Sequence, residues 1–260
     1  MLADLQQLGL WPELFLDLSS TSLLLMTSLF TSAMTAAFGI GGGVIMLAAL
    51  VNFLPVAYVI PIHGVIQASS NISRAALLRT FIDWNIIRYY FLGAVIGALI
   101  GGQFVVALPE SVLLSIVGLF ILYVVWGPKP KQLKANRYTY TIGGIWVTFS
   151  TMFIGATGPL AMALLPRKQM QSQQVSATHG TLMVVQHGLK IIIFSALGFA
   201  FKEWAVFLLM MLVTGFIGTY FGKSLLHRLP QAFFQKGVTV ILTLLALKML
   251  FDAGNIYFAS

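Results

Sequence analysis

Gly39-Ile40-Gly41-Gly42-Gly43 lies between two apolar runs and interrupts what would otherwise be one long membrane helix. A second break, Gly155-Ala156-Thr157-Gly158-Pro159, begins 116 residues later. Glycine can adopt the positive φ that such a break requires. Irregular backbone is tolerated at membrane depth only where it is buried in protein or lines a cavity. We therefore expect the two breaks to line a cavity inside a membrane protein.

The composition also indicates a membrane protein. Hydrophobic residues make up 58% of the 260 residues and charged residues 8%, whereas about a quarter of the residues of a soluble domain are charged. Several runs exceed the roughly 18 apolar residues that predict a bilayer-spanning helix. The chain has no cysteine, which excludes disulfides and thiolate metal sites. Its acidic first 18 residues lack the positive start of a cleavable signal.

The two breaks belong to an ordered series of matches between the halves of the chain. At offsets of 116 or 121 residues the matched pairs are His63 and His179, Gly64 and Gly180, Arg74 and Lys190, Gly97 and Gly218, and Pro109 and Pro230. Such a series predicts a duplication. We expect a first membrane repeat over residues 1–127, a basic cytoplasmic linker over 128–137 and a second repeat over 138–260.

Each half is expected to contain five helical elements, one of them too short to cross a bilayer. In chain order they are residues 20–38, 44–54, 57–78, 86–108 and 111–126, then 138–154, 159–165, 172–197, 203–226 and 232–250. Because five is odd, the second half enters the membrane inverted, as in many secondary transporters. We predict an all-α polytopic fold of two inverted repeats, with broken or re-entrant helices at the glycine-rich loops.

The basic residues orient this arrangement. Eleven of the fifteen lie in or beside loops on one predicted side: Arg79, Arg88, Lys129, Lys131, Lys134, Arg137, Arg167, Lys168, Lys223, Arg228 and Lys236. The positive-inside rule places these loops in the cytoplasm, so both termini of a multi-pass inner-membrane protein should lie outside. The net charge of +8 is therefore a sign of topology, and we expect no nucleic-acid partner.

Acidic residues are missing where membrane chemistry would need them. All seven lie in loops or at the ends of predicted spans: Asp4, Glu13, Asp17, Asp83, Glu110, Glu203 and Asp252. A catalytic carboxylate pair, a carboxylate metal site and an acidic proton relay all require acids at depth. We therefore predict no enzymatic activity, no catalytic residue, no metal and no cofactor.

Neutral-polar and basic residues do lie at depth, and they suit an anion. Hydroxyl, amide, imidazole and backbone N–H donors can replace the water around an oxyanion, and a helix that restarts after a break directs the positive end of its dipole inward. The predicted substrate site comprises Gly41, Gly42, Gly43, Ser70, Asn71, Gly155, Thr157, Gly158, Gln186 and His187. The predicted gate or funnel residues are His63, Arg74, His179 and Lys190.

Purely structural roles remain open for several of these residues. Glycines often serve helix packing, and the faces that contain Gly97 and Gly218 suit either packing within the chain or a homodimer. Ser70 can bond the backbone of its own helix. Arg74 and Lys190 can instead extend their charges to the membrane surface.

The G-x-G-G-G break, the later small-residue break, the duplicated halves and the basic central linker resemble the TauE/SafE family of sulfite exporters, over about residues 20–250. The second break departs from the family pattern in having fewer glycines. The resemblance implies transport of sulfite, a sulfonate such as sulfoacetate, or a related organic anion across an inner membrane.

Taken together, these features predict a secondary transporter that works by alternating access in the lipid bilayer on a small anionic substrate. An anion channel of the same architecture is the first alternative, and a membrane enzyme or scaffold the second. Since no acid lies at depth, coupling through histidine protonation or the membrane potential is favoured over a carboxylate relay.

Overall fold

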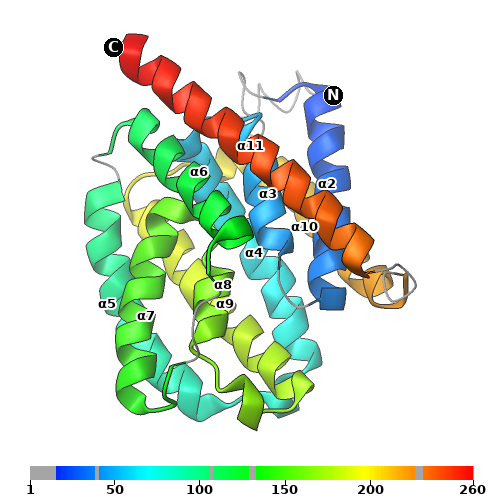
Figure 1. Ribbon diagram of the computed structural model, residues 1–260, viewed down its shortest axis with the longest axis vertical. Helices are drawn as coiled ribbons and strands as arrows, with labels where there is room; N and C mark the ends of the chain where they lie inside the picture. Colours follow the sequence, from blue (N-terminus) through cyan, green and yellow to red (C-terminus); the bar gives the residue numbers. More distant parts are fainter. Residues whose placement is uncertain (1–15, 39–40, 106–107, 129–132, 226–230, 260) are drawn as a thin grey trace.

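The computed structural model describes residues 16–38, 41–105, 108–128, 133–225 and 231–259 (Figure 1). All regular structure in these ranges is helical, which confirms the predicted all-α class. The predictions about Gly39, Lys129, Lys131 and the loop 226–230 lie outside the described residues.

Every predicted segment is a helix. The first half contains α2 (Leu18–Phe38), α3 (Gly42–Val51), α4 (Val56–Leu77), the 3-10 turn η1 (Arg79–Phe81), α5 (Trp84–Val105) and α6 (Glu110–Trp126). The second contains α7 (Arg137–Ile154), α8 (Gly158–Ala163), η2 (Arg167–Gln169), α9 (Ser172–Ala196), η3 (Phe201–Trp204), α10 (Ala205–Leu225) and α11 (Gln231–Ala259). The prediction was wrong at the end of α11, which continues to Ala259. The pair between Lys248 Nζ and Asp252, at 2.7 Å and one helical turn apart, supports the helix across the predicted end at Leu250.

Three described helical segments are long and apolar enough to cross a membrane: Trp84–Val105, Phe201–Phe221 and Lys236–Ala259. The α2, α4 and α9 helices are of similar length, with 21, 22 and 25 residues, but they are richer in polar residues. In α4 and α9 many of these polar side chains are buried inside the protein. Their lower hydropathy therefore reflects an internal site.

The α3 and α8 helices are short arms that follow the two breaks. Gly41 before α3 has φ 104° and Gly155 at the end of α7 has φ 84°, values that favour glycine. With 10 and 6 residues, the arms are about 15 and 9 Å long, against a hydrocarbon core of roughly 30 Å. Neither arm can cross a bilayer.

The helices pair in a pattern that relates the two halves. The α4 and α9 helices pack on each other at the centre, and α6 packs on α11 (Figure 1). The α5 helix packs on α7 as α10 packs on α2. Suppose that each helix of α2–α6 is exchanged in order with its counterpart in α7–α11. The α4–α9 and α6–α11 contacts then map onto themselves, and the α5–α7 contact maps onto the α10–α2 contact. This is the pairing that a two-fold relation between the halves would give.

The two ends of the molecule differ in charge. The start of α2 and the end of α11 lie at one end, which we call the terminal end, whereas η1 and η2 lie at the other (Figure 1). We call the second end the basic end, because it carries Arg79, Arg88, Arg137, Arg167 and Lys168. Contacts beside both ends of α4 and α9 show that these helices run antiparallel. Tyr58, at the start of α4, lies against Phe199, just after α9, and the Thr178 hydroxyl of α9 accepts a hydrogen bond from the backbone amide of Asp83, which follows α4 and η1 near the basic end.

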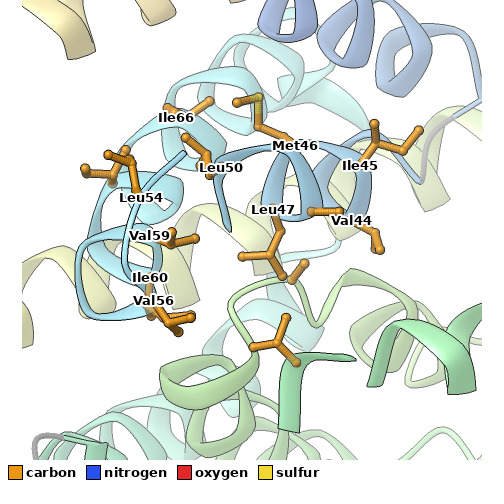
Figure 2. Close-up of a cluster of buried hydrophobic side chains, with 14 of the residues drawn as sticks. Val44, Ile45, Met46, Leu47, Leu50, Leu54, Val56, Val59, Ile60 and Ile66 are labelled. Carbon is orange, nitrogen blue, oxygen red and sulfur yellow. The ribbon is translucent and has the colours of Figure 1, made fainter. Parts of the chain in front are cut away.

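The hydrophobic core surrounds the first arm. Seven of the ten residues of α3 are buried, and Figure 2 shows Val44, Met46, Leu47 and Leu50 among side chains of α4 and the preceding turn. A helix that is apolar on every side is stable only when it is covered on every side. Protein provides this cover, so the backbone interruption beside α3 need not face lipid.

Small residues allow two helix pairs to pack closely within the chain. A Cβ atom on Gly93 would lie 1.8 Å from the Thr141 carbonyl oxygen in α7, and one on Gly97 would lie 2.2 Å from that of Ile145. On the other side of the molecule, a Cβ on Gly218 would lie 2.1 Å from the Leu29 carbonyl oxygen in α2. The predicted small-residue faces therefore pack against neighbouring helices of the same chain.

Replacing Gly93 by Ala should force α5 away from α7, because the added methyl group meets backbone that cannot move independently. We expect a loss of about 1–3 kcal/mol, measured as a lower melting temperature in detergent. Gly188→Ala is the matched control, since it lies inside α9 and its Cβ would meet nothing within 4 Å. That control should leave stability unchanged or raise it by up to about 1 kcal/mol. Equal effects of the two substitutions would contradict the close packing of α5 on α7.

Candidate functional site

The two breaks meet at one internal cavity between α4 and α9. Its volume is ≈ 40 Å³, room for about three water molecules, since each needs roughly 10–15 Å³. The described residues that line it are Thr35, Gly41, Gly43, Val44, His63, Gln67, Asn71, Arg74, Ala156, Gly158, Pro159, His179, Met183 and His187. The first turns of both arms, α3 and α8, therefore contribute to its wall.

The first arm, α3, also touches the second break directly. A Cβ atom placed on Gly155 would lie 2.8 Å from Leu47 Cδ1 of α3. Gly155 thus combines a positive φ with a close approach to the arm of the other half. The positive φ disfavours any residue with a side chain at this position, and an added Cβ would also require Leu47 to move. Segments that lie more than 100 residues apart in the sequence are in this way joined at the centre of the protein.

A histidine from the neighbouring helix holds the start of each arm. His63 Nε2 of α4 donates to the Gly43 carbonyl at 2.8 Å, and His179 Nε2 of α9 donates to the Gly158 carbonyl at 3.1 Å. Both contacts require the hydrogen on Nε2, which leaves Nδ1 of a neutral imidazole as an acceptor. The two histidines that were predicted to gate the site therefore also position the broken helices.

Arg74 places a cation in the cavity wall. Its guanidinium donates to Asn71 Oδ1 and, at 3.2 Å, to His179 Nδ1. Asn71 is fixed in turn by donating from Nδ2 to the Gln67 carbonyl at 2.7 Å. Only 7% of Arg74 is exposed, so the alternative in which its charge extends to the membrane surface is wrong.

Lys190 is also buried, with no exposed surface. Its Nζ donates to the Gly155 carbonyl at 3.0 Å, and its stem passes over Gly64, where a Cβ would lie 3.0 Å from Lys190 Cδ. The alternative of a surface-extended charge is wrong here too. Lys190 lies behind the second break and outside the cavity lining.

A buried polar network supports the second break. Gln186 Oε1 accepts from the Tyr90 hydroxyl at 2.9 Å, and its Nε2 donates to Thr157 Oγ1 at 3.0 Å. All three residues have no exposed surface. Gln186 and Thr157 were predicted to contact substrate, whereas their contacts in the structure fix the conformation of the break. Tyr90 was not predicted, because a tyrosine in an apolar helix reveals no polar role until its partner is known.

The remaining predicted residues divide into two groups. Gly41, Gly43, Asn71, Gly158 and His187 line the cavity, and the His187 ring lies 5.8 Å from the ring of His63. Gly42 packs on α2 instead, since its Cβ would lie 2.1 Å from the Thr31 carbonyl oxygen. Ser70 lines a neighbouring cavity of ≈ 120 Å³ with Thr35 and Arg74.

The chemistry of the cavity suits a negative ligand. Its described lining contains a guanidinium, three imidazoles and two side-chain amides, and no carboxylate. Within the described ranges, no group of three or more His, Asp or Glu residues could hold a metal ion. A charged donor such as Arg74 forms its strongest hydrogen bonds with carboxylate, phosphate or similar oxyanions.

Comparison with known proteins identifies the family of the chain. No solved structure matches the chain. The chain is 25% identical over 182 residues to a protein of Comamonas testosteroni named "Probable inner membrane transporter protein TsaS", an alignment that covers 65% of this chain and 74% of that protein. The model of the sulfite exporter TauE/SafE family matches residues 24–249. The chain is therefore a membrane transporter of the TauE/SafE sulfite exporter family.

Proposed function

We propose that the protein is a secondary transporter that carries a small anion, sulfite or a sulfonate such as sulfoacetate, across the inner membrane by alternating access. The observation that carries this proposal is the meeting of both helix breaks and the Arg74 guanidinium at one buried cavity. Backbone amides and a fixed cation there can replace the hydration shell of an oxyanion. A volume of ≈ 40 Å³ favours the smallest of these anions, sulfite, in the state that the structure represents.

Two inverted membrane repeats, residues 1–127 and 138–260 joined by a basic linker, would provide the moving parts. The reciprocal helix pairs support this relation. So does the central contact pattern, in which Arg74 of one half lies over Gly180 of the other and Lys190 lies over Gly64. Rocking of such halves about a fixed central site would expose it to each side in turn.

A carrier is favoured over the alternative of an open channel. At the terminal end lies a vestibule of ≈ 460 Å³, whose described lining includes Tyr58, Ile60, Phe194 and Trp204. It shares no described lining residue with the central cavity. A conducting pore needs a continuous path between its two mouths, whereas an alternating carrier is closed on at least one side.

Arg74→Gln should weaken sulfite binding about tenfold or more, because a hydrogen bond to a charged group contributes about 1.5–3 kcal/mol. A ligand that binds the folded protein raises its melting temperature, so the shift can be measured against sulfite, sulfate, sulfoacetate, taurine and acetate. Transport should persist at saturating anion. Arg79→Gln, an exposed arginine five residues further along, is the matched control and should bind normally. Identical titrations of the two variants would refute a role for Arg74 in binding.

Gly158→Leu should abolish transport while the protein still inserts and melts near the wild-type temperature. A Cβ atom on Gly158 would lie 3.7 Å or more from the nearest side-chain atoms, which is ordinary van der Waals contact. The rest of the leucine side chain would then occupy the cavity that Gly158 lines. Gly158→Ala adds only the methyl group and should keep substantial flux, as measured in proteoliposomes. Normal transport by Gly158→Leu would show that substrate does not pass this cavity. Gly42→Leu is a poorer test, because it collides with α2.

The basic end should face the cytoplasm, with both termini outside. Since the chain has no cysteine, single cysteines can report the orientation. An impermeant thiol reagent should label Thr80→Cys, at the exposed basic end, in inside-out vesicles only. It should label Lys202→Cys, in exposed η3, in right-side-out vesicles only. The reverse pattern would overturn the proposed orientation.

A further inference from the structure

Two buried cations lie at different levels along the α4–α9 pair. Arg74 of α4 lies over Gly180 of α9, where a Cβ would be 3.1 Å from its Nε. Lys190 of α9 lies over Gly64 of α4 at 3.0 Å. Gly64 and Arg74 are ten residues apart in one helix, a rise of about 15 Å. Arg74 of the first half thus lies over Gly180 of the second half, and Lys190 of the second half lies over Gly64 of the first.

The two cations differ in what they face. Arg74 lines the central cavity and also the ≈ 120 Å³ cavity beside it, which Leu77, Leu78 and Ser176 line toward the basic end. Thr35 lines both as well. A second cavity therefore adjoins the central cavity on the side of the basic end, with Arg74 and Thr35 between them.

Lys190 lies on the opposite boundary. Its acceptor, Gly155, packs against Ile60, whose Cδ1 would be 3.3 Å from a Cβ there. Ile60 is also part of the wall of the terminal-end vestibule, together with Tyr58 and Trp204. The Lys190–Gly155 contact therefore belongs to the layer between the central cavity and the vestibule.

The Lys190 ammonium has hydrogen-bonding capacity that the described protein does not use. It carries three N–H donors, and among the described residues its acceptor is the single Gly155 carbonyl. Removing an ammonium from water costs several kcal/mol unless nearby groups compensate. An oxyanion would accept from the remaining donors and supply the opposite charge.

We propose that Lys190 is a second anion-binding cation, the counterpart of Arg74, which contacts the anion when the cavity opens to the terminal-end vestibule. In the state that the structure represents, the Gly155 carbonyl holds Lys190 outside the cavity. The anion would bind at Arg74 from the basic end and at Lys190 from the terminal end, and the site would pass it between them as the halves rock. This inference rests on the proposed anion transport.

The test is the half-saturating sulfite concentration for transport from each side, measured in right-side-out and inside-out vesicles. Lys190→Met should raise this half-saturating concentration at least tenfold when sulfite is added at the terminal end and less than twofold when it is added at the basic end. Arg74→Gln should instead raise it more at the basic end than at the terminal end. Lys190→Arg, which keeps the charge, should restore most of the terminal-end affinity. A purely structural role for Lys190 would instead change both sides equally.

If Lys190→Met fails to insert into the membrane, the exposure of Lys190 during transport can be measured on the wild-type protein. A small impermeant amine reagent should modify Lys190 from the terminal end during turnover, with sulfite protecting it, as mapped by peptide mass spectrometry. Equal effects of Lys190→Met on the two sides, or no sulfite-protected modification of Lys190, would overturn the inference. In either case saturable sulfite transport by the wild type would leave the proposed function standing, whereas its absence would remove the proposed function itself.

Discussion

An interrupted helix leaves backbone carbonyls and amides without helical partners, and hydrocarbon supplies none. The rest of this structure depends on how the protein meets that constraint. His63 and His179 donate to the Gly43 and Gly158 carbonyls at the starts of the arms, and Lys190 donates to the Gly155 carbonyl at the second break. Hydrophobic side chains then bury most of α3 (Figure 2). Lys190 of α9 and Thr151 of α7 thus supply donors to the Gly155 carbonyl at the end of α7, and the two histidines hold the first turns of the arms in place.

The same polar groups create the site. Several of the buried donors at the breaks come from the two central helices, and α4 and α9 accordingly carry imidazoles, amides and cations where other membrane helices carry leucine. Burying such groups is costly unless each has a partner, and most of them do. Arg74, three imidazoles and two side-chain amides line the cavity, and its described lining contains no carboxylate. In the proposed transporter, one set of residues would thus serve both the packing of the breaks and the recognition of the anion.

The contacts between the halves suit a device with two states. Each cation lies over the His-Gly pair of the opposite half, so relative motion of the halves changes the surroundings of both cations together. In this structure the surroundings of the two cations differ, because Arg74 lines the cavity whereas Lys190 donates to the Gly155 carbonyl outside it. Two cations in related positions but with unequal surroundings are what the proposed alternation between two states would produce. Packed interfaces of this kind switch between discrete arrangements and do not deform continuously.

The sequence by itself determined the helices, the two breaks and the polar composition of α4 and α9, because apolar run length, glycine clusters and isolated polar residues are local signals. Polar residues in apolar helices also drew the prediction to His63, His179, His187 and Arg74, which line the cavity. Only the tertiary structure decided which of these residues face the cavity. Gly42 was expected at the site and packs on α2, Ser70 lines a neighbouring cavity, and Gln186 and Thr157 brace the break with Tyr90. The direction of a side chain depends on how α3 and α8 dock between helices far away in the chain, and no local pattern encodes that docking.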